Sequence, residues 1–123
     1  ILEKLERGET VNNAPEILAA LFRTSVQPYL ISWFKYNPQT EIAKLKIPVL
    51  IIQGTTDIQV RVEDAEKLSE SNTSAKKVLI EGMNHVLKTS EMDRTKNIQT
   101  YSNSKLPLNE ALIPELVNFI NQK

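Results

Sequence analysis

The fold is decided by residues 47–85, which read IPVLIIQGTTDIQVRVEDAEKLSESNTSAKKVLIEGMNH. The stretch opens with an uninterrupted apolar run at residues 49–52, which is typical of a strand covered by helices on both faces of its sheet. A helical pattern follows at residues 62–70, and residues 77–81 predict a second strand. Strand, helix and strand with connections this short form a βαβ unit, so we expect two parallel strands joined by a right-handed crossover.

Each predicted strand is followed by a residue capable of acid–base chemistry. Asp57 comes three residues after Gly54, and His85, the only histidine, comes three residues after Gly82. Because parallel strands end at the same edge of a sheet, both side chains should lie in neighbouring loops there. A carboxylate that accepts the imidazole N–H fixes the tautomer and stabilises the imidazolium, so the pair has the chemistry of the acid and base of a hydrolytic triad.

Less specific interpretations of the two residues stay open. A lone histidine is more often incidental than catalytic, and Asp57 could instead cap a helix, although the helix predicted from Val62 begins rather late for that. Asp64 and Glu81 are alternative carboxylate partners for His85. Asp64 is explained by its place in the first turn of a helix and Glu81 by its place in a strand, so Asp57 is the better partner.

The segments PVLIIQGTTD, which ends at Asp57, and VLIEGMNH, which ends at His85, resemble the last two core strands of the α/β-hydrolase fold. In that family the triad acid follows the seventh strand and the histidine the eighth, which implies Asp57 as the acid and His85 as the base. The likeness is nearest to bacterial serine hydrolases of the serine aminopeptidase and lysophospholipase-like group. It implies an α/β fold class, with the C-terminal βαβα portion of the hydrolase core over residues 47–123, preceded by cap-type helices over residues 1–46.

The sequence departs from that family at the nucleophile. The family's serine lies in a G-x-S-x-G turn, but glycine occurs here only at positions 8, 54 and 82, none of them flanking a serine in that pattern, and there is no cysteine. The chain also opens within a helical pattern on Ile1, not on methionine. We therefore expect a piece of a longer protein that supplies the acid and the histidine, lacks the nucleophile and is inactive alone.

The flanking segments are predicted to be mostly helical. Residues 1–9 form a short amphipathic pattern. Asn13 is placed to cap a helix with Pro15 in its first turn and Glu16 completing a capping box, and Asn37 is placed to cap another helix. After the histidine the sequence turns polar, and residues 88–105 show no recognisable element. Asn109 is placed to cap a final apolar helix, which resembles the closing helix of the α/β-hydrolase fold.

A dense apolar patch lies between the first helices, at Tyr29, Leu30, Ile31, Trp33, Phe34 and Tyr36. Core packing is the simpler interpretation of this patch, and the wall or lid of a ligand pocket is the alternative. Under the hydrolase resemblance, Tyr29, Trp33 and Phe34 would line the acyl pocket. Met83, two residues before the histidine, would also contact the substrate.

Composition bears on the partners of the chain. Lys plus Arg and Asp plus Glu number 15 each, so there is no electrostatic case for a nucleic acid or an anionic membrane. No apolar run approaches the roughly 18 residues of a membrane-spanning helix. With one histidine and no cysteine we expect no metal site, and the chemistry needs no organic cofactor. The compartment stays open, with the cytoplasm slightly favoured.

The sequence therefore predicts the C-terminal part of a serine hydrolase that cleaves an ester or amide bond. Its partners would be a small-molecule substrate and the missing N-terminal half of the same fold. Two other classes stay open: a non-catalytic α/β-hydrolase-like binding or interaction domain, and a flavodoxin-like module in which Asp57 and His85 are incidental. Because a two-stranded sheet with an unpaired apolar edge is marginal, we also expect the isolated chain to self-associate, through that edge or through the cap helices.

Overall fold

The computed structural model describes residues 1–122 and has a mixed α/β fold with a two-stranded parallel sheet. The chain divides into two compact units, Ile1–Glu41 and a second unit that begins at Ile42. The first unit is helical, and the second contains both strands. No helix in the described part of the chain combines the length and the apolar character needed to cross a membrane.

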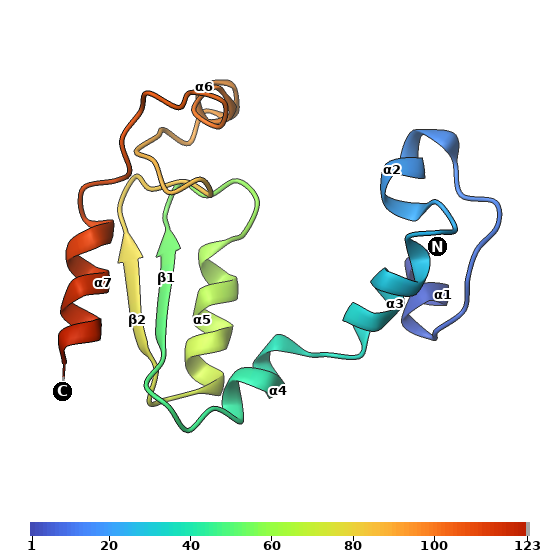
Figure 1. Ribbon diagram of the computed structural model, residues 1–123, viewed down its shortest axis with the longest axis horizontal. Helices are drawn as coiled ribbons and strands as arrows, with labels where there is room; N and C mark the ends of the chain where they lie inside the picture. Colours follow the sequence, from blue (N-terminus) through green and yellow to red (C-terminus); the bar gives the residue numbers. More distant parts are fainter. Residues whose placement is uncertain (123) are drawn as a thin grey trace. The chain divides into compact units, whose positions relative to one another are not determined.

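The first unit consists of short helices (Figure 1), with one leucine and one glutamine buried among them. Its elements are α1 (Leu2–Glu6), the 3-10 turn η1 (Glu16–Leu18), α2 (Ala19–Phe22) and α3 (Gln27–Phe34). Leu5 of α1 and Gln27 of α3 are both fully buried. The Gln27 side chain accepts a hydrogen bond from Val11 N and donates to Val11 O and Phe22 O. It therefore ties the loop after α1 to the start of α3.

The helix start predicted at Asn13 is wrong. The first helical residue is Glu16, in η1, and no side chain caps this turn. Pro15 precedes it with an extended backbone (φ −53°, ψ 139°). A proline disfavours helical backbone in the residue before it, so Ala14 cannot serve as the first residue of a helix capped by Asn13.

Core packing of the apolar patch is also contradicted. Trp33 is 56% exposed, and most of the other large side chains of the patch are exposed with it, namely Tyr29, Phe34 and Tyr36. The rings of Tyr29 and Trp33 contact each other, with centroids 4.7 Å apart. These side chains therefore form part of the surface of the first unit.

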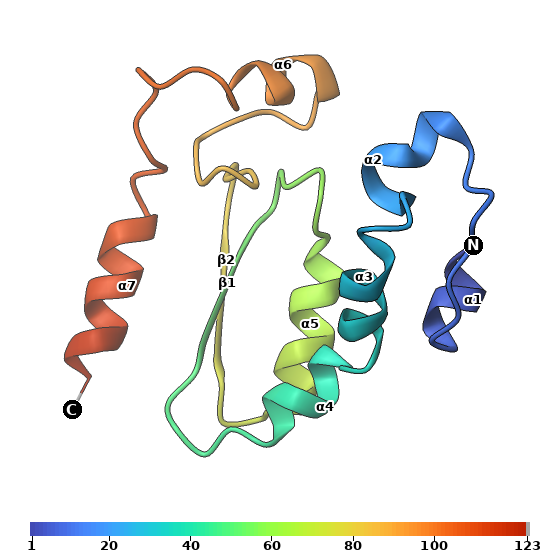
Figure 2. The same cartoon turned by 45° about the vertical axis from the view of Figure 1, so that its right-hand side comes forward.

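The second unit is built on two parallel strands with helices on either side (Figures 1 and 2). Helix α4 (Pro38–Ala43) leads into it and is capped as predicted by Asn37, whose side-chain oxygen accepts hydrogen bonds from Gln39 N and Thr40 N. The predicted βαβ unit is confirmed, with boundaries close to the expected ones. The elements that follow α4 are β1 (Leu50–Gly54), α5 (Val62–Ser71), β2 (Lys76–Ile80), α6 (Arg94–Gln99) and α7 (Leu112–Asn121).

The two strands pair in parallel, from Leu50 opposite Lys76 to Gly54 opposite Ile80. Helix α5 contacts both strands and buries Ala65. Helix α7 packs against a sheet face through an apolar cluster of Ile80, Met83 and Leu112, with Ile52, Val78 and Leu116 packed against it. An ion pair of 3.1 Å between Lys76 Nζ and the Glu115 carboxylate adds a polar contact between β2 and α7.

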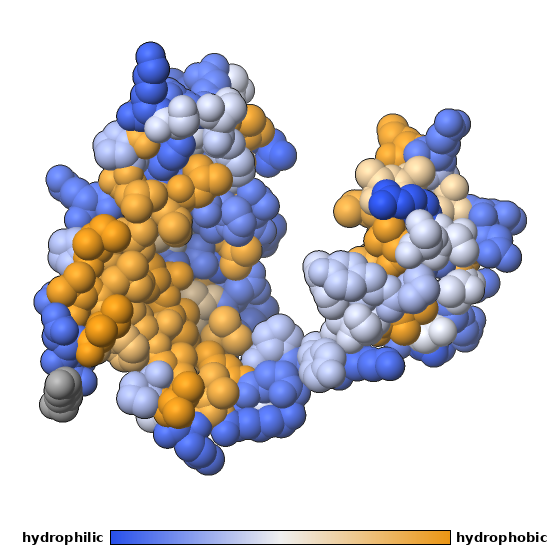
Figure 3. All heavy atoms as spheres, in the orientation of Figure 1, coloured by the Kyte–Doolittle hydropathy of each residue, from blue (hydrophilic) through white to orange (hydrophobic). Residues whose placement is uncertain are grey.

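Helix α7 carries a second apolar stripe that no described residue buries. Ile113, Val117 and Ile120 follow one another at i, i+4 and i+7, so they share one face of the helix, and all three are exposed. Figure 3 shows apolar side chains gathered over α7 and the adjoining strands of this unit. The face is a candidate contact surface because contiguous exposed apolar patches often mark interaction sites.

Residues 88–105, where the sequence shows no recognisable element, contain a helix and are tied together by hydrogen bonds. The helix is α6, which begins at a cap that the sequence analysis missed: the Asp93 side chain accepts a hydrogen bond of 2.9 Å from Lys96 N. Lys88 Nζ donates to the carbonyl oxygen of Thr100 at 3.0 Å and so closes the segment on itself. In Figures 1 and 2, α6 lies beyond the carboxyl ends of the strands.

Asn109 is buried and does not cap α7, which begins at Leu112 without a side-chain cap. Its side-chain oxygen accepts a hydrogen bond from Ala111 N, and its amide donates to Glu81 O and Thr89 Oγ1. The residue thus holds the turn before α7 against the end of β2. Pro114 lies in the first turn of α7, where a proline is tolerated because its missing amide would be unpaired there.

Candidate active site

Asp57 and His85 contact each other beyond the carboxyl ends of β1 and β2. The distance between Asp57 Oδ2 and His85 Nδ1 is 2.9 Å. The expectation that the two parallel strands bring these residues into neighbouring loops is therefore confirmed. The carboxylate at the imidazole belongs to Asp57 and not to Asp64, which instead accepts a hydrogen bond from Arg61 N at the start of α5.

Hydrogen bonds just past the strand ends join the roots of the two loops. Thr55 N donates to Ile80 O at 3.0 Å, and Thr56 N donates to Met83 O at 3.1 Å. The Thr55 hydroxyl adds a third link, because its oxygen accepts a hydrogen bond of 2.9 Å from Gly82 N. The parallel ladder thus continues into the loops, which brings the next residues of each loop close together.

The surroundings of Asp57 favour its ionised form. Its Oδ1 accepts hydrogen bonds from Gln59 N at 2.8 Å and Val60 N at 3.0 Å, and its side chain is only 8% exposed. Burial by itself raises the pKa of a carboxyl, but the hydrogen bonds from the two main-chain amides and from His85 outweigh it and hold the pKa of Asp57 below its ordinary value. Asp57 is therefore negatively charged at neutral pH, as the orienting acid of such a pair must be.

His85 presents its other ring nitrogen to solvent. Its side chain is 41% exposed, and because Nδ1 bonds to Asp57, Nε2 is the nitrogen free to meet a reacting group. Within the described part of the chain, Nε2 has no hydrogen-bond partner.

The loop that carries His85 is a tight turn: Asn84 N donates to Lys88 O, and Leu87 N donates to Asn84 O. Leu87 has a φ of 63°, in the left-handed region that leucine rarely adopts.

No protein-family model matches the chain, and a search of curated proteins finds no significant match. A functional assignment therefore depends on the geometry of the Asp57–His85 pair.

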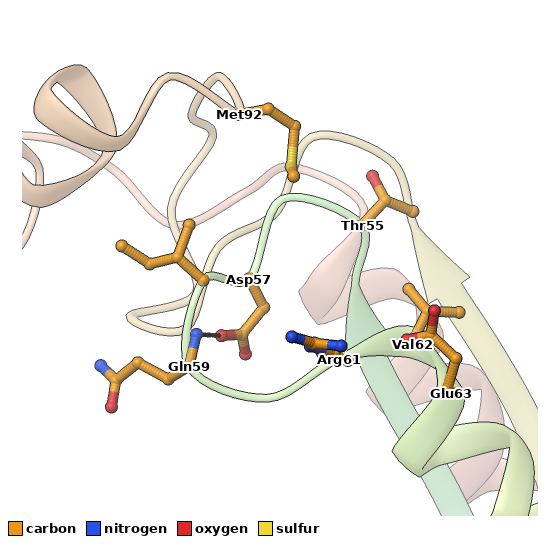
Figure 4. A pocket seen from close by; sticks show the side chains of 8 residues that line it. Thr55, Asp57, Gln59, Arg61, Val62, Glu63 and Met92 are labelled. Carbon is orange, nitrogen blue, oxygen red and sulfur yellow. Dashed lines mark hydrogen bonds between the residues drawn. The ribbon is translucent and has the colours of Figure 1, made fainter.

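Two hollows border the pair. The smaller, of about 200 Å³, is lined by Asp57 and His85 together with residues that include Gly54, Met83 and Leu87. The larger, of about 600 Å³, is shown in Figure 4 and is lined by Asp57 and residues that include Thr55, Arg61, Glu63 and Met92. The figure also shows the hydrogen bond that the main-chain N–H of Gln59 donates to the Asp57 carboxylate inside the loop. Asp57 thus borders both hollows, and His85 opens into the smaller one.

The predicted substrate-binding residues divide between the two units. Tyr29, Trp33 and Phe34 belong to the first unit, where they are exposed, and their contact with a substrate stays a prediction. Met83 borders the smaller hollow but is 2% exposed, in the core cluster beside α7, so its contact with a substrate also stays a prediction. Residues 1–122 hold no group of three or more histidine, aspartate or glutamate side chains placed to share a metal ion.

Three buried polar residues close to the pair were missed in the sequence. Asn84, Asn97 and Thr100 are hydrogen-bonded to one another, and Asn97 also reaches the carbonyl oxygen of Thr56, the residue before Asp57. We call these residues, with the Thr56 carbonyl, the amide bridge. Asparagine and threonine are usually exposed residue types, and nothing in their sequence positions distinguishes these three from solvated ones.

Proposed function

We propose that this chain is the C-terminal part of an α/β-hydrolase-fold serine hydrolase and supplies the acid and the base of its catalytic triad. The observation that carries the proposal is the 2.9 Å contact between Asp57 Oδ2 and His85 Nδ1, made at the carboxyl ends of two adjacent parallel strands. Active sites of open α/β sheets lie at that edge. The order of acid before histidine along the chain also agrees with the order in that fold.

In this mechanism His85 acts as general base and then as general acid through Nε2. Asp57 accepts the Nδ1–H, which keeps the proton off Nε2 and leaves it able to take the proton of an attacking hydroxyl. The imidazolium that forms is stabilised by the carboxylate, whose lowered pKa keeps it ionised at neutral pH. Nε2 then returns the proton to the leaving alcohol or amine, as ester or amide hydrolysis requires.

The nucleophile would come from outside these residues. No serine of the chain stands in a G-x-S-x-G turn, and no serine hydroxyl in the described part is bonded to His85. The backbone amides that stabilise the oxyanion would lie beside that serine. We therefore infer that the chain alone has no hydrolase activity and gains it only with the sheet that carries the nucleophile.

The test compares this chain with a longer protein that includes the preceding stretch of the gene. On a p-nitrophenyl ester the chain alone should give no turnover above buffer, and the longer protein should turn over. In the longer protein His85→Ala should abolish activity, by a factor on the order of 10⁶ in kcat, and Asp57→Asn should lower it by roughly 10⁴. Turnover by the chain alone that disappears in His85→Ala would contradict the inferred inactivity.

Labelling separates the enzyme from a non-catalytic binding domain of the same fold. A fluorophosphonate probe reacts with a serine activated by a histidine, so the longer protein should be labelled and its His85→Ala variant should not. Absence of labelling and turnover in a folded longer protein would overturn the proposed hydrolase and favour the binding domain.

A further inference from the structure

The amide bridge is buried and uses all its polar atoms. Asn97 is 0% exposed and Asn84 is 1% exposed. The Asn97 amide nitrogen donates to Thr56 O at 2.8 Å and to Glu91 O at 2.9 Å, while its oxygen accepts from Asn84 Nδ2 at 3.2 Å. Asn84 Nδ2 also donates to Thr100 Oγ1 at 2.6 Å. Such a fully satisfied buried network tends to fix one local structure.

The bridge joins the loop of the acid to the loop of the histidine. At one end, Thr56 immediately precedes Asp57, and at the other end Asn84 immediately precedes His85. Asn97, on α6, bonds to both. The Thr100 hydroxyl closes the network by donating to Asn97 O at 2.7 Å. The buried side chain of Asn97, on a third segment, thus connects the residue before Asp57 to the residue before His85.

We propose that Asn97 is a positioning residue, which sets the geometry of the Asp57–His85 pair by holding Thr56 and Asn84 at a fixed separation. Residues 86–111, between His85 and α7, lie across the strand ends and are called the strap. Helix α6 is the part of the strap that carries the Asn97 amide. The role of this geometry in catalysis rests on the proposed function, whereas the geometry of the pair itself can be tested in this chain.

The chemistry of the bridge requires an amide at position 97. The side chain donates two hydrogen bonds to carbonyl oxygens and accepts one from an amide. An aspartate of the same shape could accept from Asn84, but its carboxylate would face the carbonyl oxygens of Thr56 and Glu91 without a proton to share. Because a buried charge among unpaired acceptors is costly, the strap should separate from the strand-end loops.

The other contacts of the two loops do not replace the bridge. The hydrogen bonds of Thr55 and Thr56 to the end of β2 fix the roots of the loops. The hydrogen bonds from Gln59 N and Val60 N fix the Asp57 carboxylate within its own loop. Apart from the contact of the pair itself, the amide bridge is, within residues 1–122, the hydrogen-bonded link between the loop of Asp57 and Asn84.

The single histidine gives a direct readout in the full chain of 123 residues. At pH 7.5, the ¹⁵N chemical shifts of the imidazole report which nitrogen carries the proton, and the Asp57 contact should hold it on Nδ1. In Asn97→Asp, with the strap released, His85 should shift towards the Nε2–H form that exposed histidines prefer. Thr100→Val, a milder variant that removes one of the two acceptors of Asn84 Nδ2, should give a smaller shift in the same direction.

Thr56→Val is the matched control. It makes the same chemical change at a buried threonine of the bridge, but the Thr56 hydroxyl has no hydrogen-bond partner. This variant should keep the Nδ1–H form of His85. Folding of each variant is checked by the dispersion of its amide resonances, and if Asn97→Asp unfolds, the comparison of Thr100→Val with Thr56→Val decides.

If Asn97→Asp folds and its His85 tautomer is unchanged, the positioning role of Asn97 is overturned. If Asn97→Asp unfolds, an unchanged His85 tautomer in Thr100→Val overturns it. So does an equal shift in Thr56→Val and Thr100→Val. Failure of the proposed function looks different: the tautomer would respond to Asn97→Asp, but the longer protein would show no turnover or probe labelling. If both inferences hold, Asn97→Asp in the longer protein lowers kcat at least tenfold with little change in KM.

Discussion

Gly54 lies directly against the main chain of Met83, so closely that a Cβ at position 54 would stand 1.9 Å from the Met83 carbonyl oxygen and 2.5 Å from its carbonyl carbon. That oxygen accepts the hydrogen bond from Thr56 N that joins the two site loops. The end of β1 therefore needs glycine for lack of space, and the same contact places the loop that leads to His85.

We predict that Gly54→Ala is among the most disruptive single methyl additions to the second unit. Because main-chain atoms block the new methyl group, one strand end must move, and the free energy of unfolding should fall by about 3 kcal/mol or more. His85 should lose part of its Nδ1–H form, since the loop that carries it shifts. Urea unfolding followed by circular dichroism gives the first quantity and ¹⁵N chemical shifts give the second.

Gly82→Ala is the control, because Gly82 lies just after the neighbouring strand β2 but has free space around it. The nearest atom to a Cβ at Gly82 is 3.8 Å away, and its φ of 67° is the feature that favours glycine there. Gly82→Ala should therefore lower the free energy of unfolding only by the strain of a left-handed backbone at alanine, roughly 1–2 kcal/mol. A smaller loss in Gly54→Ala than in Gly82→Ala would show that the contact with Met83 is not the constraint.

Acid should weaken the fold partly through Asp57. Because its pKa is lowered in the folded state, its contribution to stability is present above the unfolded pKa of about 3.9 and is lost as the pH falls through the folded value. Asp57→Asn should lower the free energy of unfolding at pH 7 by about 1–3 kcal/mol, and this difference should shrink below about pH 4. Urea titrations of both proteins from pH 2.5 to 7 measure the difference, and a constant value over that range would contradict the prediction.

Removal of the Thr56 hydroxyl should not destabilise the protein. Thr56 Oγ1 is buried without a hydrogen-bond partner, so Thr56→Val removes a desolvated polar atom and should leave the stability unchanged or raise it by about 1 kcal/mol. Thr100→Val loses two hydrogen bonds and should cost about 1–3 kcal/mol. The midpoints of thermal unfolding rank the two variants. A lower midpoint in Thr56→Val than in Thr100→Val would contradict the prediction that the Thr56 hydroxyl is unpaired and the Thr100 hydroxyl is hydrogen-bonded.

The pair could be predicted from the sequence because it depends on local and strongly patterned signals. The apolar run at residues 49–52, the stop at Gly54 and the helical stretch before β2 define a βαβ unit. Parallel pairing then brings the strand ends together, so Asp57 and His85 meet as a consequence of topology.

The strap could not be predicted, because its structure depends on long-range hydrogen bonds. Asn97 is buried by contacts with residues 41 and 13 positions away in the sequence. Asparagine is a residue type that is mostly exposed, so the sequence around it does not indicate burial. The prediction that the apolar patch near Trp33 packs in a core was wrong for the opposite reason. Its composition is typical of a core, but the short helices of the first unit leave most of its large side chains exposed.

Two exposed surfaces of the isolated chain are suited to self-association. The expectation of self-association gains a specific surface in the α7 stripe of Ile113, Val117 and Ile120, which runs along an exposed face of the helix. β1 pairs only with β2 in the described residues, so its other edge is also open. We predict that the chain forms dimers or larger species through these surfaces in a concentration-dependent manner.

Sedimentation velocity over a hundredfold range of concentration measures this association. The double variant Val117→Lys, Ile120→Glu places charges in the α7 stripe and should raise the dissociation constant at least tenfold, because charges are poorly tolerated in an apolar contact. Trp33→Glu makes the comparable change on the first unit, where the sequence predicted the alternative contact surface. Loss of association in Trp33→Glu alone would move the interface to the helices of the first unit, and a monomeric parent chain at every concentration would exclude self-association through either surface.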